Sequence, residues 1–244
     1  MTESRAVIVG GGRGLGRAAA HALAARGCAV ILVSRSESEL VDVAREIEHE
    51  GREAKIIVCD ATDPHAVADR IGGLDDVDIL VNSAGTNVPT PFVDVTEQIY
   101  DQVMNTNVRA TVLVSQHVVR SMLRAERGGA IVNVSSQMGH VGAARRVLYC
   151  TSKHAVEGFT KSLAVELAPM GIRVNSVAPT FVETEMTAPF LADVEFRRSV
   201  LDQIPLGRLG TVDEVADAIT FLASPQASLI TGASLLVDGG WTAR

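Results

Sequence analysis

The chain has 244 residues, 47% of them apolar, and its 22 basic and 29 acidic side chains give a formal net charge of −7 at pH 7. The acidic balance argues against general affinity for nucleic acid or for an anionic membrane, and the apolar fraction argues against disorder. Three cysteines without metal-ligand spacing exclude a disulfide framework, and with no signal peptide or membrane-spanning stretch we expect a cytoplasmic protein that holds no metal.

Seven short apolar runs recur along the chain and predict buried β-strands. Near-continuous Val, Ile and Leu residues are typical of parallel strands that are covered on both faces. The runs span residues 6–9, 29–33, 56–58, 79–81, 131–134, 174–177 and 234–237.

Longer amphipathic stretches separate these runs and predict helices at about residues 14–27, 36–50, 64–71, 96–126, 148–169 and 212–223. This alternation implies right-handed crossovers and therefore an α/β fold with a doubly wound parallel sheet. Because no linker, repeat or shift in composition divides the chain, we expect one domain over residues 1–244. The segment 185–207 interrupts the alternation, and we expect a small helical flap over the carboxyl ends of the strands, where ligands bind in open α/β sheets.

A glycine-rich run at 10–16 follows the first predicted strand and opens the first predicted helix. Glycines allow a sharp turn and a close approach to phosphates, and the helix amino end offers free N–H groups to a pyrophosphate. The spacing G-x-x-x-G-x-G predicts a dinucleotide site rather than an empty turn. The candidate cofactor-binding residues here are Gly10, Gly12, Arg13, Gly14, Leu15 and Gly16.

The end of the second strand indicates which dinucleotide is preferred. An acidic residue there would bind the ribose 2′-hydroxyl of NAD, but this chain has Ser34 and Arg35 and no carboxylate until Glu37. Arg35 can bind a 2′-phosphate through charge-assisted hydrogen bonds, and Arg13 can approach it from the glycine loop. We therefore expect NADP(H) to be preferred over NAD(H); the alternative is that both arginines are merely solvated.

Two further strand ends supply candidate cofactor contacts. Asp60 and Ala61 end the third strand, where the carboxylate can accept the adenine amino group, although Asp60 could instead cap a helix. The run 82–85, Asn-Ser-Ala-Gly, follows the fourth strand, where small residues let the backbone pass close to a cofactor or simply make a turn. The contacts expected from this run involve Asn82, Ala84 and Gly85.

Tyr149 and Lys153 lie four residues apart on a predicted helix, so that both face the same side. A free phenol, with a pKa of about 10, is a poor acid–base catalyst at neutral pH, and a nearby ammonium lowers that pKa. The pair is thus suited to proton transfer at a carbonyl or alcohol oxygen. The alternative is a surface pair without catalytic function.

Two more polar residues complete this candidate active site. Ser136 is expected to end the fifth strand, over residues 131–136, where its hydroxyl can bind the substrate oxygen, and strand alternation disfavours the neighbouring Ser135. Asn107 lies within a predicted helix, a poor position for Asn on propensity alone. It is either a tolerated surface residue or the mark of a kink that holds a water for proton relay to Lys153.

These motifs together resemble the short-chain dehydrogenase/reductase family over the whole chain. The resemblance rests on the Gly10 to Gly16 motif, Asp60, residues 82–85, Asn107, Ser136, Tyr149-x-x-x-Lys153, residues 179–184 and residues 238–240. It implies a Rossmann sheet of order 3-2-1-4-5-6-7, usually in a homotetramer. It also implies that Tyr149 is the acid–base, that Lys153 binds the nicotinamide ribose, that Ser136 orients the substrate and that Asn107 supports a water relay.

The same resemblance adds residues 179–184 to the cofactor site. The contacts expected there come from Pro179, from the backbone of Val182 and from the hydroxyl of Thr184. The chain departs from the family pattern at Val9 and Ser83, which bear on loop stability, and at Thr180, where the family usually has glycine. None of these departures removes a group that transfers protons.

The resemblance implies an NADP(H)-dependent carbonyl reductase or alcohol dehydrogenase. The substrate is then a sugar, sugar acid or polyol, or alternatively a 3-oxoacyl thioester. One arginine in residues 127–130 and 169–171, where carrier-protein reductases tend to be basic, argues weakly against the thioester. A non-catalytic nucleotide-binding scaffold is a further hypothesis, but it would not need the Ser–Tyr–Lys set. A methyltransferase is another, but its cofactor has no pyrophosphate and would not require the glycine loop paired with Arg35.

The substrate-side residues are the least specified by sequence. The expected lining residues are Ser136, Gln137, Met138, Tyr149 and Phe190, together with His140, Ala143, Arg145 and Thr187. Arg145 and Arg146 could meet a carboxylate, but solvated side chains are the favoured interpretation. We expect His140 to be a loop residue rather than a catalyst, because Tyr149 already fills the acid–base role.

Overall fold

The computed structural model describes residues 4–243 and contains one seven-stranded parallel sheet of order β3-β2-β1-β4-β5-β6-β7. The predicted fold class and strand order are therefore confirmed. The reversal of strand order beside β1 creates the crevice where ligands bind in such sheets. The strands are β1 (Arg5–Val9), β2 (Ala29–Ser34), β3 (Ala54–Val58), β4 (Ile79–Asn82), β5 (Gly129–Val134), β6 (Ile172–Pro179) and β7 (Ser234–Val237).

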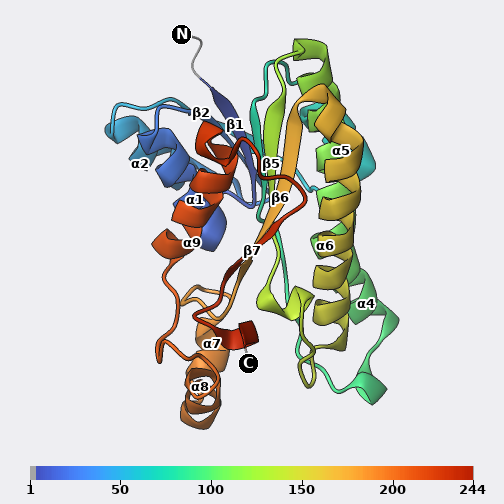
Figure 1. Cartoon of the computed structure of the whole chain (residues 1–244), viewed down its shortest axis with the longest axis vertical. Helices are drawn as coiled ribbons and strands as arrows, with labels where there is room; N and C mark the ends of the chain where they lie inside the picture. Colours follow the sequence, from blue (N-terminus) through green and yellow to red (C-terminus); the bar gives the residue numbers. More distant parts are fainter. Residues whose placement is uncertain (1–3, 244) are drawn as a thin grey trace.

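Helices cover both faces of this sheet (Figure 1). One face packs against α1 (Gly14–Ala25), α2 (Glu37–His49) and α9 (Val212–Ala223), and the other against α3 (Pro64–Arg70), α5 (Ala110–Ala125) and α6 (Val147–Leu167). Alternate residues of β1 serve the two layers: Ile8 belongs to the first core and Val7 to the second. Burial on both faces explains why the strands are near-continuous apolar runs.

The helix expected over residues 96–126 is interrupted in its middle. It consists of α4 (Glu97–Met104), a π-helical segment (Asn105–Arg109) and α5. A π-helical turn is a known form of helix distortion and is frequent at functional sites. The helix is therefore distorted at Asn107, which is only 1% exposed, so the surface interpretation of this residue is wrong. The other predicted helices differ from the observed ones only near their ends.

The segment 185–207 forms a flap of two short helices, α7 (Ala188–Leu191) and α8 (Val194–Leu201). Figure 1 shows them at the end of the sheet opposite to the chain's amino terminus, beyond the carboxyl ends of the strands. The flap has an apolar core of its own, made by Leu191, Val200, Ile204 and Leu209. It therefore packs as a small separate layer next to the ligand-binding edge, as the sequence predicts.

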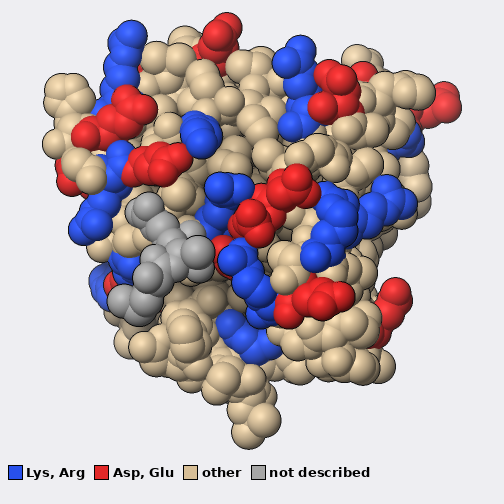
Figure 2. Space-filling view, turned by 90° about the horizontal axis from the view of Figure 1, so that it is seen from above, with Lys and Arg blue, Asp and Glu red and all other residues tan. Residues whose placement is uncertain are grey.

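Acidic and basic side chains are interspersed on the molecular face that Figure 2 shows. Oppositely charged side chains also form ion pairs, for example Arg124 with Asp75 at 2.9 Å and Arg127 with Asp78 at 3.0 Å. This face therefore offers no broad surface of one sign. Within residues 4–243, no helix has both the length and the apolar character that a membrane crossing requires.

Candidate active site

A cavity of about 390 Å³ lies at the carboxyl edge of the sheet, between the glycine loop and the flap. It collects predicted residues from seven separate segments of the chain, so the topology brings the motifs together. The predicted site residues that line it are Gly10, Gly12, Arg13, Gly14, Leu15, Ser34, Arg35, Asp60, Ala61, Ala84, Gly85, Ser136, Tyr149, Lys153, Pro179, Val182 and Thr184.

The glycine loop has the shape that a phosphate cradle requires. Gly10 has φ +79°, and a Cβ there would come within 2.8 Å of the Ala84 backbone nitrogen. Gly16 does not line the cavity, but a Cβ on it would lie 2.0 Å from the Gly10 carbonyl oxygen. Gly10 therefore provides the tight turn, and Gly16 lets α1 pack directly against that turn.

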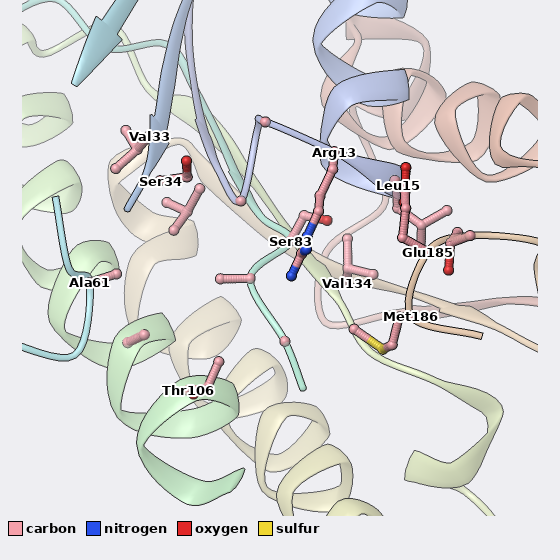
Figure 3. A pocket seen from close by; sticks show the side chains of 18 of the residues that line it. Arg13, Leu15, Val33, Ser34, Ala61, Ser83, Thr106, Val134, Glu185 and Met186 are labelled. Carbon is pink, nitrogen blue, oxygen red and sulfur yellow. The ribbon is translucent and has the colours of Figure 1, made fainter. Parts of the chain in front are cut away.

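The arginines expected to bind a 2′-phosphate both line the cavity and both are exposed. Figure 3 shows Arg13 extending from the glycine loop toward Ser83, with Ser34 on one side of the cavity. Glu39, which the sequence interpretation missed, also lines the cavity, and its Oε1 lies 3.8 Å from Arg13 Nη1. The sequence feature that could have identified Glu39 is its position one turn into the helix that follows Arg35.

Asp60 is free to meet a ligand, because another residue caps the next helix. Asp63 accepts hydrogen bonds from His65 N and Ala66 N and thereby caps α3, so the cap interpretation of Asp60 is wrong. Asp60 Oδ1 accepts from Thr62 N at 2.9 Å and from Thr62 Oγ1 at 2.8 Å. Burial acts to raise the pKa of Asp60, but these hydrogen bonds and nearby Arg35 lower it overall, so the carboxylate is charged.

Tyr149 and Lys153 face the cavity from the first turns of α6. Lys153 Nζ lies 5.7 Å from the centroid of the Tyr149 ring and donates a 2.8 Å hydrogen bond to the carbonyl oxygen of Val134. Burial lowers the pKa of Lys153 to about 8, and the Glu157 carboxylate opposes this shift. Burial raises the pKa of Tyr149, against a hydrogen bond from Ser136 that lowers it. Burial therefore decides the direction of both shifts, and the lowering of the Tyr149 pKa that was expected from Lys153 is not found.

Ser136 lies two residues beyond the end of β5 rather than within it, and it begins a short turn. Its Oγ donates to Gln137 Oε1 at 2.8 Å and accepts from Met138 N at 3.1 Å. These bonds fix the direction of the hydroxyl beside Tyr149. Gln137 and Met138 are buried behind it and do not line the cavity, so Gln137 acts on Ser136 and not directly on a ligand.

Two of the predicted asparagines do not line the cavity. Asn107 Oδ1 accepts from Thr86 N at 2.7 Å, and its Nδ2 donates to Thr86 O and Ser152 Oγ, each at 2.9 Å. Asn82 Nδ2 donates to Asn133 Oδ1 at 2.8 Å and to Ser115 Oγ at 3.0 Å, between buried elements. Both side chains therefore hold neighbouring segments of the chain together around the cavity, through hydrogen bonds within the protein.

The favoured interpretation of Arg146 as a solvated residue is wrong, although Arg145 is exposed as expected. Arg146 is only 7% exposed, and its guanidinium carbon lies 5.1 Å from the centroid of the Phe190 ring. Phe190 itself does not line the cavity and is engaged with Arg146. His140 is a loop residue, as expected, with its Nε2 2.9 Å from Ser234 Oγ.

The cavity wall fits a dinucleotide that carries polar groups along its length. Thr180 lines the cavity, and its Oγ1 is buried without a hydrogen-bond partner among the described residues. A buried hydroxyl in that state calls for a ligand atom. The Gly10 turn suits the pyrophosphate, the two arginines suit a ribose phosphate, and Asp60 suits an adenine amino group. Thr180 suits the polar amide of a ring at the other end of the cavity.

Comparisons with known proteins agree with this geometry. The family model described as enoyl-(acyl carrier protein) reductase matches residues 10–242. The L-xylulose reductase of Bos taurus is 40% identical over 100% of this chain and 98% of its own. The 3-oxoacyl-[acyl-carrier-protein] reductase of Vibrio cholerae is 40% identical over 96% of each chain.

A solved structure extends the likeness to three dimensions. This chain superposes with a TM-score of 0.92 on a solved structure from Agrobacterium tumefaciens that contains bound NADP. That protein is described as a 2-deoxy-D-gluconate 3-dehydrogenase and is 37% identical in sequence. The superposition covers 99% of this chain and 97% of that one. Sequence and fold therefore match over essentially the whole length.

Proposed function

This chain belongs to the short-chain dehydrogenase/reductase family, and on that premise we propose that Tyr149 is the general acid/base with which it interconverts a ketone and a secondary alcohol. The chain is an oxidoreductase that depends on NADP(H). The observation that carries the proposal is the cluster of Tyr149, Lys153 and Ser136 at the cavity wall. Residues 1–244 act as one domain in this proposal.

The cofactor supplies a hydride to the carbonyl carbon or accepts one from the alcohol. Arg13 and Arg35 would hold the ribose 2′-phosphate, because they are the cations that line this part of the cavity. The glycine loop would receive the pyrophosphate, Asp60 the adenine amino group, and the region of Pro179, Val182 and Thr184 the nicotinamide end. Thr180 Oγ1, unpartnered and buried, would donate or accept beside this last group.

In the direction of reduction, Tyr149 delivers a proton to the carbonyl oxygen, while Ser136 turns its single hydroxyl proton from Gln137 Oε1 to the same oxygen. The raised pKa of Tyr149 keeps the phenol protonated before reaction. Lys153, with a pKa of about 8, is mostly an ammonium at neutral pH and stabilises the phenolate that remains. We keep the water relay from Lys153 past Asn107 as part of the proposal, with the Asn107 side chain in a positioning role.

We place the substrate among sugars, sugar acids and polyols rather than acyl thioesters. Arg127 is the one basic residue of the stretches 127–130 and 169–171, and Asp78 and Asp76 engage it at 3.0 and 3.6 Å. It is therefore not free to dock an acidic carrier protein. Reduction of a 3-oxoacyl thioester remains the second candidate, because the Vibrio cholerae relative carries that activity in its name.

A homotetramer in the cytoplasm completes the proposal. Helices α5 and α6 expose large apolar side chains, among them Val112 at 41% and Val165 at 79%, and such faces favour pairing between copies. All three cysteines are buried and none forms a disulfide, as suits a reducing compartment. Sedimentation at equilibrium tests the assembly, because a stable species at 25.8 kDa would contradict it.

The activity is tested by following NADPH oxidation against keto sugars, keto sugar acids, simple ketones and acetoacetyl thioesters, with NADH in parallel. We expect turnover of the carbohydrate-type ketones with NADPH. Tyr149→Phe should lower kcat by about 10²–10⁴-fold, the usual contribution of general acid–base catalysis, while the Kd for NADPH stays nearly constant. Retained turnover in this variant would remove Tyr149 from the chemistry.

A further inference from the structure

Arg146 is a buried cation whose charge has no acidic partner. It directly precedes α6, three residues before Tyr149, and only 7% of it is exposed. Among residues 4–243, the contact of its guanidinium is with the Phe190 ring, and its nitrogens are not among the fully buried polar atoms that lack a partner, so they keep some contact with solvent. Arginine is seldom buried to this extent without a partner, because the desolvation of its charge must be offset.

Arg173, a second partly buried arginine, differs from Arg146 because backbone carbonyl oxygens accept hydrogen bonds from its guanidinium. Arg173 donates to the carbonyl oxygens of Leu222 at 2.7 Å and Ser224 at 3.1 Å. Its hydrogen bonds hold the loop after α9 and leave it little capacity for a ligand. Arg146 lacks any such carbonyl contacts, so its donors are available to a molecule from outside the chain.

The surroundings of Arg146 place this free capacity beside the reacting centre. The Phe190 ring of the flap lies 5.1 Å from the guanidinium carbon, and such stacking leaves the guanidinium edge able to donate. Its electrostatic neighbours are Arg145, Tyr149 and Cys150, and none of them is a carboxylate. The charge of Arg146 acts to lower the pKa of Tyr149, so the two side chains lie near each other, although Arg146 is not itself among the residues that line the 390 Å³ cavity.

We propose that Arg146 binds a carboxylate of the substrate, so that the preferred substrate is an oxo acid rather than a neutral ketose or polyol. The inference rests on the proposed function and narrows its substrate class. A guanidinium matches a carboxylate through two parallel hydrogen bonds, and a single buried cation balances a single negative charge. The carboxylate then lies a few bonds from the carbonyl that Tyr149 and Ser136 receive.

The test compares keto acids with neutral ketones of the same chain length, using the NADPH-loaded enzyme. For the wild type we expect kcat/KM for a keto sugar acid to exceed that for the matched neutral ketose by 10-fold or more. Arg146→Gln should lower kcat/KM for the acid by about 10–100-fold, as charge-assisted hydrogen bonds are worth, and change the value for the ketose less than 3-fold. Arg26→Gln, an exposed charge at the end of α1, serves as the control for net charge.

A binding measurement supports the kinetics without turnover. Calorimetry with malonate on the NADP-loaded wild type should give binding that Arg146→Gln loses and Arg146→Lys retains in part, whereas malonamide should not bind. If Arg146→Gln fails to fold, the preference of the wild type for the keto acid over the ketose and the partial malonate binding of Arg146→Lys still test whether Arg146 binds the carboxylate. Preference for a keto sugar phosphate over the acid would overturn the carboxylate assignment.

Two further outcomes separate this inference from the proposed function. Equal losses with acid and ketose in Arg146→Gln, or no wild-type preference for the acid, would refute the role of Arg146 while the oxidoreductase activity stands. If NADPH binds but neither substrate class is turned over, the proposed function itself fails. Loss of assembly without any change in acid preference would assign Arg146 to packing.

Discussion

Asn107 Nδ2 donates a 2.9 Å hydrogen bond to Ser152 Oγ, and this contact ties the π-helical segment to the helix that carries Tyr149 and Lys153. The same amide holds Thr86, just beyond the cofactor-facing Gly85, through two more hydrogen bonds. One side chain therefore sets the relative position of three segments. The π-helical turn provides the local geometry that lets this amide face inward.

Asn107→Ala removes three hydrogen bonds and leaves buried polar groups without partners. We expect the free energy of unfolding to fall by about 2–4 kcal/mol, at roughly 1 kcal/mol for each hydrogen bond and more where a buried partner is stranded. Urea titration followed by circular dichroism measures this loss. Because the residue positions the site, kcat should fall more than KM rises, and an unchanged kcat in the folded variant would confine Asn107 to stability.

Arg35→Ala removes a cation from the part of the cavity where the 2′-phosphate would bind. We expect the KM for NADPH to rise by about 10–100-fold, since charge-assisted hydrogen bonds contribute about 1.5–3 kcal/mol. The KM for NADH, which lacks this phosphate, should change little, and Arg26→Ala provides the control for net charge. Equal effects on both cofactors would contradict the phosphate assignment.

Gly16→Ala tests the close packing of α1 against the glycine loop. A Cβ at this position would lie 2.0 Å from the Gly10 carbonyl oxygen, so the helix must move away. We expect a loss of about 1–3 kcal/mol in stability, as for other overpacked sites, and weaker NADPH binding, although Gly16 does not line the cavity. Gly73→Ala is the matched control, because a Cβ there meets nothing within 4 Å.

The buried ammonium of Lys153 should make the stability of the ligand-free protein depend on pH. Its pKa of about 8 in the folded state lies below the ordinary value of 10.5, so between these values the unfolded chain binds a proton that the folded chain does not. The contribution of Lys153 to the free energy of unfolding therefore rises with pH across this window, by on the order of 3 kcal/mol.

Lys153→Met isolates this contribution from other titrating groups. The difference between the unfolding free energies of variant and wild type should shift in favour of the wild type as the pH rises from 8 to 10.5. The loss of the Lys153 hydrogen bond to Val134 adds an offset that does not depend on pH. Parallel stability curves for the two proteins would show that the ammonium keeps its ordinary pKa.

Sequence patterns predict the sheet and most of the cofactor site because these features depend on local rules. Apolar runs, the glycine spacing and the i, i+4 placement of Tyr149 and Lys153 each follow from the geometry of a single element. The parallel topology then brings the strand ends to one edge. This is why Gly10, Asp60 and Ser136, far apart in the chain, line one cavity.

The residues that sequence interpretation misplaced depend on tertiary packing. Arg146 is an ordinary charged residue in the sequence, and only the folding of Phe190 and the flap over it removes it from water. Glu39 meets Arg13 because α2 packs close to Gly12, where a Cβ would lie 2.9 Å from the Glu39 Cβ. Neither contact follows from spacing or composition alone, although the position of Glu39, one turn into the helix after Arg35, indicates a place near the cofactor site.

The pairing of β1 with β4 has a kinetic consequence. Ala6 pairs with Ile79, which lies 73 positions later in the chain, so this pairing closes a much longer loop than the pairing of Arg5 with Ala29 in β2. Closing a loop of this length costs chain entropy and slows folding relative to local contacts. The first three strands can therefore form a partial sheet, but the Gly10 turn meets Ala84 only after closure. During refolding, the ability to bind NADPH should emerge late and together with native packing, well after most secondary structure has formed.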